Sequence, residues 1–197
     1  ALPIFICSHA ILILLNQQRR YPALRLAAYA QGLLSISFSA FWSVLAVMLS
    51  DHFHLGSAVA GGFGIAGAAG ALAAPLSGAL ADKVGPGRVT QMGAGLVTLS
   101  FLSMLAMPLL PVHGQLLLIA LAAIGFDLGL QSSLVAHQTL VYSLEPQARG
   151  RLNALLFTLV FIGMALGSVF GSKAYVLSGW TGVLILATVA GAAGTLI

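Results

Sequence analysis

The chain has 197 residues, of which 59% are hydrophobic and 6% are charged, and its mean hydropathy is +1.04. A water-soluble domain carries about 25% charged residues, so eight basic and four acidic side chains are too few to cover a soluble fold of this length. The net charge of +4 does not indicate nucleic-acid binding, because the basic residues lie between apolar runs and form no patch. The composition predicts an integral membrane protein.

Five apolar runs are each long enough to cross a bilayer as a helix, because a helix rises ~1.5 Å per residue through a hydrocarbon core ~30 Å thick. In chain order they cover 24–50, 57–80, 89–110, 115–142 and 152–178. They do not alternate apolar and polar residues as barrel strands do. We therefore expect an all-α membrane protein, with a kink at Pro75 in the second run.

The two ends of the chain carry shorter apolar segments. Residues 1–15 are too short to span a membrane alone, and residues 180–197 stop without a polar exit. We expect residues 1–15 to be the tail of a preceding transmembrane helix and residues 16–23 to be a cytoplasmic linker. Residues 24–197 then form the transmembrane bundle.

Basic residues lie in alternate breaks between the apolar runs. Breaks 51–56, 111–114 and 178–179 contain no lysine or arginine. The remaining breaks hold seven basic residues, which the positive-inside rule places in the cytoplasm: Arg19, Arg20, Arg25, Lys83, Arg88, Arg149 and Arg151. The eighth, Lys173, is expected to extend toward the opposite membrane surface.

Small residues recur at a spacing that places them on one face of a helix. Three such faces are present: Gly163, Gly167 and Gly171; Gly125 and Gly129; and Gly67, Ala71, Ala74 and Gly78. Faces of this kind let helix backbones approach closely inside a membrane. We interpret them as packing surfaces of the bundle, and a role as sliding surfaces in a moving transporter stays open.

The most specific motif is Gly78-Ala-Leu-Ala-Asp82-Lys83-Val-Gly85-Pro-Gly87-Arg88. Its glycines permit a tight turn between two helices, and Asp82 lies where it can accept hydrogen bonds from a helix start or pair with a cation. A generic turn on the positive-inside side would also fit. The pattern Gly-x-x-x-Asp-Lys-x-Gly-x-x-Arg resembles the loop motif of the major facilitator superfamily.

Further strings extend this resemblance over most of the chain. A loop containing Glu145, Arg149, Gly150 and Arg151 resembles the loop before the eleventh helix of that superfamily. Four more strings are similar to the bacterial drug and sugar efflux branch: Gln31-Gly-Leu-Leu, Phe38-Ser-Ala-Phe-Trp42, Asp127-Leu-Gly-Leu-Gln131 and Leu152-Asn153. The resemblance implies export of a small molecule across a bacterial inner membrane, driven by protons.

Two features indicate which half of such a transporter this chain represents. The fourth complete span has no arginine, and the segment from Gly163 to Gly171 lacks the proline expected of an amino-terminal half. The resemblance therefore implies the carboxy-terminal six-helix half-bundle, built from inverted three-helix repeats. A missing amino-terminal half would be its partner.

Polar residues inside the spans are the candidate transport residues, because polar groups in lipid are costly and usually functional. Asp127 is the only acid within a span and lies roughly 18 Å from Gln115, near the bilayer midplane. We predict that it couples transport to protons or recognises a cation; a structural role is equally open. The predicted substrate pathway comprises two helical stripes: Gln31, Ser35, Ser39 and Trp42 on the first, and Gln131 and Gln138 beside Asp127 on the second.

Two other functions are compatible with parts of this sequence. A non-transporting scaffold, or a half-transporter that needs a partner chain, fits the same spans. An intramembrane serine protease is disfavoured, because the string around Ser77 lacks the leading glycine of Gly-x-Ser-Gly and His137 has no evident orienting acid. No nucleotide-binding loop occurs, and we expect no enzyme activity, cofactor, metal site or nucleic-acid partner.

Overall fold

A computed structural model describes residues 21–71 and 73–197, and every described element is a helix. The predicted all-α fold class is confirmed. In chain order the elements are α2 (Pro22–Phe53), α3 (Ser57–Ala71), α4 (Ala73–Val84), α5 (Pro86–Met104), the 3₁₀ helix η1 (Met107–Leu109), α6 (Val112–Leu144) and α7 (Arg149–Leu196). The predicted tail over 1–15 and most of the linker over 16–23 fall outside the described residues.

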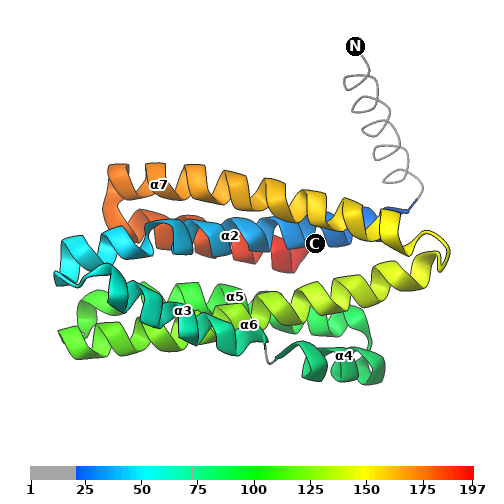
Figure 1. The fold of residues 1–197 in the computed structure, drawn as a ribbon, viewed down its shortest axis with the longest axis horizontal. Helices are drawn as coiled ribbons and strands as arrows, with labels where there is room; N and C mark the ends of the chain where they lie inside the picture. Colours follow the sequence, from blue (N-terminus) through cyan, green and yellow to red (C-terminus); the bar gives the residue numbers. More distant parts are fainter. Residues whose placement is uncertain (1–20, 72) are drawn as a thin grey trace, which may run out of the picture.

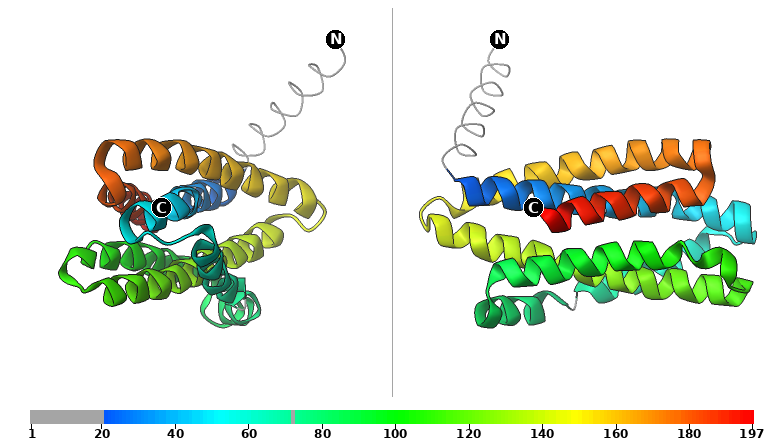
Figure 2. Two further views of the ribbon diagram at one scale, coloured as in Figure 1. Left: turned by 60° about the vertical axis from the view of Figure 1, so that its left-hand side comes forward. Right: turned by 180° about the vertical axis from the view of Figure 1, so that it is seen from behind.

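Helix α7 reverses direction at Gly179, whose φ of 62° and ψ of −157° are not helical. A positive φ is accessible to glycine at little steric cost, so the chain turns here without a loop. The first arm of α7 (149–178) and the second arm (180–196) run in opposite directions (Figures 1 and 2). The predicted break at 178–179 is confirmed.

Helix α2 packs closely against the first arm of α7 through the predicted glycine face. A Cβ atom added at Gly163 would meet the carbonyl oxygen of Gly32, and one at Gly167 would meet that of Ile36. At Gly171 the added atom would lie 2.7 Å from the Cα of Ala40. The interpretation of this face as a packing surface is confirmed, because only glycine allows such backbone contact.

Helices α5 and α6 repeat this arrangement on the other side of the bundle. Added Cβ atoms at Gly93 and Gly129 would each meet the carbonyl oxygen of the other glycine, and one at Gly125 would lie 2.6 Å from Ser100 Oγ. Of the third predicted small-residue face, only Gly78 has a described side-chain environment, and it makes an ordinary contact with Val135.

The second apolar run is described as two helical segments, α3 and α4, on either side of residue 72, which lies outside the described residues. Pro75 is the third described residue of α4. The described residues do not include the link between the two segments, so the kink at Pro75 stays a prediction.

Three described helices, α2, α6 and α7, are long and apolar enough to cross a membrane. The start of α2, α4 and the turn between α6 and α7 lie at one end of the bundle (Figure 1). We call this the basic end, because its described exposed side chains include Arg25, Lys83, Arg88, Arg149 and Arg151. The opposite end, called the far end, holds the end of α2, the turn between α5 and α6, and Gly179.

Candidate functional site

Asp127 lies at the middle of α6, as predicted, with the helix extending about equally to either side. Its side chain is 5% exposed. All basic residues of the described chain lie toward the two ends of the bundle, so none shares this level with the carboxyl group. Asp127 is therefore a buried acid halfway along α6, away from the lysines and arginines of the described chain.

An aromatic cluster surrounds this level of the bundle. Its centre is Phe126, whose ring centroid lies 4.7 Å from that of Phe101 and 4.8 Å from that of Phe41. Six residues from four helices form the cluster: Phe38, Phe41, Trp42, Phe101, Phe126 and Trp180. Phe41, Phe101 and Phe126 are fully buried in the core, whereas Phe38 and Trp42 are half-buried and leave ring surface on which an apolar or cationic molecule could pack.

Trp42 links the cluster to the acid. Its indole lies beside the Asp127 carboxyl group. The buried Nε1 makes no hydrogen bond of ordinary geometry within the described part of the chain. Trp42 thus joins α2 to the level of Asp127.

A second polar contact between α2 and α6 lies closer to the basic end. The Nδ1 atom of His137 is 2.9 Å from Oε1 of Gln31, and both side chains are buried. The amide oxygen can only accept a hydrogen bond, so Nδ1 is the donor and Nε2 is the nitrogen left for other partners. His137 was not predicted as a site residue, because it points about 80° round the helix from Asp127.

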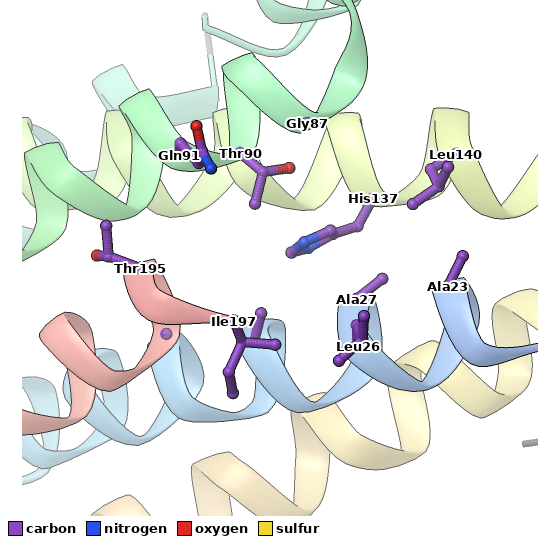
Figure 3. A pocket seen from close by; sticks show the side chains of 12 residues that line it. Ala23, Leu26, Ala27, Gly87, Thr90, Gln91, His137, Leu140, Thr195 and Ile197 are labelled. Carbon is purple, nitrogen blue, oxygen red and sulfur yellow. The ribbon is translucent and has the colours of Figure 1, made fainter.

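The His137 ring borders a cavity of about 220 Å³ between α2, α5, α6 and the second arm of α7. Figure 3 shows the imidazole pointing into this space, toward Thr90 on one side and Ile197 on the other. The lining is mostly apolar, with Thr90, Gln91 and Thr195 as further polar groups. His137 is thus the ionisable side chain at this cavity.

The remaining predicted pathway residues make contacts within the bundle. Ser35 donates to the carbonyl oxygen of Gln31, one turn earlier in its own helix, at 2.8 Å. Ser39 lies against Gly167 of α7. Gln138 donates to Oδ1 of Asn153 at 3.3 Å and so joins α6 to α7, whereas Gln131 is half-buried.

The two loop motifs lie at the basic end. Gly85 has a φ of 91° and ends α4, while Pro86 begins α5, so Gly85 is the turn residue. Asp82, Lys83 and Arg88 are exposed. Gly87 lies inside α5 with helical neighbours, so its predicted role in the turn is wrong.

The second loop connects three helices. Tyr21, which precedes α2, donates a hydrogen bond to the carboxylate of Glu145. Arg149 donates from Nε to the carbonyl oxygen of Tyr142 at 3.2 Å, and Arg151 is exposed. The loop thus fixes the end of α6 and the start of α7 against the start of α2.

The protease arrangement is not formed by the candidate residues. Ser77 donates to Oγ of Ser132 at 2.7 Å, and His137 pairs with Gln31. A nucleophilic serine needs a base within hydrogen-bond reach, and these partners are not bases. Among residues 21–71 and 73–197, no group of three or more His, Cys, Asp and Glu side chains could hold a metal ion.

Comparison with known proteins indicates that this chain is related to transporters. Two proteins named as uncharacterized transporter YgaY, from Escherichia coli strain K12 and from E. coli O157:H7, are each 36% identical to this chain over 73 residues. The matched stretch covers 37% of this chain and 18% of each relative, so the chain matches less than a fifth of their length. The family model described as Major Facilitator Superfamily matches residues 27–197, which is most of the chain. The chain is a multi-pass membrane protein that belongs to the Major Facilitator Superfamily.

Proposed function

We propose that this chain is the carboxy-terminal six-helix half of a proton-coupled secondary transporter, of the efflux branch, that exports a small molecule. Family membership supports transport, and the relatives are named as transporters. The two arms of α7 and the antiparallel helices before it fit a six-pass half-bundle made of two three-helix repeats.

The observation that carries the proposal is the position of Asp127. An isolated carboxylate inside a membrane is costly, and such residues usually pair with a cation or a proton. Asp127 is buried halfway along α6, and the basic side chains of the described chain lie toward the ends of the bundle. Reversible protonation at this position would couple movement of the bundle to the proton gradient.

The substrate would pass along α2 and α6, beside the aromatic cluster. Trp42 and Phe38 offer ring faces at the level of Asp127, and the half-buried Gln131 offers an amide one turn along α6. In a two-half transporter this surface supplies one wall of the path. The second wall would come from an amino-terminal six-helix half.

The proposed orientation follows from charge. The exposed basic side chains gather at one end of the bundle, and the positive-inside rule assigns such an end to the cytoplasm. We place the protein in a bacterial inner membrane with the basic end inside. The far end then faces the periplasm.

Replacement of Asp127 by asparagine in the complete transporter tests proton coupling. The Asp127→Asn variant should lose export driven by a pH gradient for every probe that the parent protein exports, because asparagine keeps the shape of the side chain but cannot exchange a proton. Uptake of ethidium and of radiolabelled sugars into inverted vesicles measures this, because export appears as uptake when the cytoplasmic face lies outside. Asp127→Glu, which keeps the carboxyl group, serves as the matched control and should retain part of the coupled export.

Exchange of labelled for unlabelled substrate at equal pH separates the two roles open to the carboxyl group. Such exchange requires no net proton movement, so Asp127→Asn should retain it if the residue handles protons alone. Loss of exchange together with coupled export would assign Asp127 to substrate binding instead. Unchanged pH-driven export by Asp127→Asn would contradict the proposal.

A further inference from the structure

The far end of the bundle contains a cavity that none of the predicted site residues lines. Its volume is about 450 Å³, within the range of about 300–1,000 Å³ typical of small-molecule sites. The end of α2, η1, the start of α6 and the turn of α7 at Gly179 enclose it. Asp127 and His137 are not among the lining residues, and Trp180 is the lining residue that the cavity shares with the aromatic cluster.

A carboxylate and two aromatic rings define the chemistry of this cavity. Asp51 is its acidic residue, and the hydroxyl group of Tyr175 donates to Oδ2 of Asp51 at 3.0 Å. This bond ties the carboxylate to α7 and leaves Oδ1 for a ligand. The ring of Trp180 also lines the cavity and is itself held by Phe41, with ring centroids 5.5 Å apart.

The rest of the lining is uncharged or apolar, apart from His52. Met48, Met104 and Met107 provide polarizable, adaptable side chains, which suit contact with ligands of irregular shape. Neither lysine nor arginine lines the cavity. The acidic group is therefore the dominant charge that a ligand would meet.

We propose that this far-end cavity binds a small organic cation, with Asp51 as the counter-charge and the rings of Tyr175 and Trp180 as its aromatic walls. A carboxylate attracts ammonium groups, and indole and phenol faces attract cations through their ring quadrupoles. This binding does not depend on proton coupling at Asp127. It assigns the Gly179 turn a second role, because Tyr175 and Trp180, which line the same cavity, come from the two arms that the turn joins.

Fluorescence of Trp180 provides the direct test. The chain contains two tryptophans, so Trp42→Phe leaves Trp180 as the sole indole reporter. This variant, reconstituted in lipid vesicles, is titrated with benzyltrimethylammonium and with its neutral isostere neopentylbenzene. We expect saturable quenching with at least a tenfold lower Kd for the cation. Equal affinities for the two probes, or no saturable quenching by the cation, would overturn the proposal.

Charge variants then locate the counter-charge. Asp51→Asn should raise the Kd for the cation at least tenfold and leave that for neopentylbenzene within twofold. Lys173→Gln, a charge change on the same α7 arm but outside the lining, is the matched control and should change neither Kd by more than twofold. If Asp51→Asn keeps the preference for the cation, the proposal fails.

Tyr175→Phe keeps the ring but removes the hydrogen bond to Asp51, so it provides a second variant should Asp51→Asn not fold. It should weaken cation binding two- to fivefold with neutral binding unchanged; an unchanged cation Kd would count against the arrangement. The proton-coupling hypothesis is tested by transport in Asp127→Asn, whereas the far-end cavity is tested by cation binding. Failure of either hypothesis therefore leaves the other result intact.

Discussion

Helix α2 presents two faces that are built on different principles. Toward the first arm of α7 its backbone lies against glycines, with Gly32 and Ala40 meeting Gly163 and Gly171. Toward α6 it presents side chains, with Gln31 bonded to His137 and Trp42 beside Asp127. The face toward α7 packs closely because glycines leave room for backbone contact. The face toward α6 makes its contacts through paired side chains.

This difference gives the two faces of one helix different mechanical properties. Close backbone packing has no adjustable part, because no side chain can rotate to relieve a clash. The polar and aromatic face contains groups that can exchange partners or protons. A transporter must move one surface while another stays intact, and α2 offers both.

The largest expected effect lies on the glycine face. Gly163→Ala places a methyl group against the carbonyl oxygen of Gly32, a backbone atom that can move only with its helix. We expect a loss of about 3 kcal/mol, at the upper end of typical overpacking costs, and a melting temperature lower by roughly 6–12 °C. Thermal unfolding in detergent, followed by tryptophan fluorescence, measures it.

Gly150→Ala is the matched control for this substitution. It lies in the first turn of the same helix, and an added Cβ atom there would meet nothing within 4 Å. Alanine favours helix over glycine by about 1 kcal/mol, so this variant should be neutral or slightly more stable. Equal destabilisation by the two substitutions would show that the glycine face is not a packing surface.

Substitutions on the polar face of α2 should destabilise the protein less than Gly163→Ala does. The effects of two of them should depend on each other. Gln31→Leu removes the acceptor of His137 Nδ1 and leaves a buried donor unsatisfied, which costs about 2 kcal/mol. Adding His137→Phe removes that donor as well, so the double variant should recover at least about 1 kcal/mol relative to the sum of the single effects. Chemical denaturation of all four proteins measures the coupling, and strictly additive effects would refute the pairing.

The smallest effect is expected where α2 meets the second arm of α7. Ser37 donates to the carbonyl oxygen of Ala187 at 2.7 Å, and both residues are buried. Ser37→Ala should cost about 1 kcal/mol, the usual net value of one hydrogen bond. Ser43→Ala, which removes only a bond to the same helix at an exposed position, should stay within about 0.5 kcal/mol. Equal losses in the two variants would contradict an interhelical role for Ser37.

The helices and their close-packing faces could be predicted because they depend on local composition. Apolar runs define spans, and glycines four residues apart define a helix face wherever the partner lies. The break at Gly179 and the central position of Asp127 follow from the same local pattern. The kink at Pro75 stays a prediction, because the link between α3 and α4 at residue 72 lies outside the described residues.

The pairing of polar side chains could not be predicted from spacing. His137 and Gln31 are 106 residues apart, and their contact depends on how α2 and α6 are rotated against each other. Gln138 was assigned to the face of Asp127, yet its amide turns to Asn153 of α7, since a long side chain reaches neighbours on either side of its helical position. The far-end cavity likewise forms only where four separate segments meet.

The reversal at Gly179 has a practical consequence for mapping the topology of this protein. Because the helical arms on either side are joined by one glycine, the second arm begins without a linker that could accept an epitope tag or a protease site. The exposed connection at His54 and Gly56 is a more accessible position at the same end of the bundle. A tag inserted there would report the location of the far end while leaving the fold intact, whereas one inserted at Gly179 would separate the two arms.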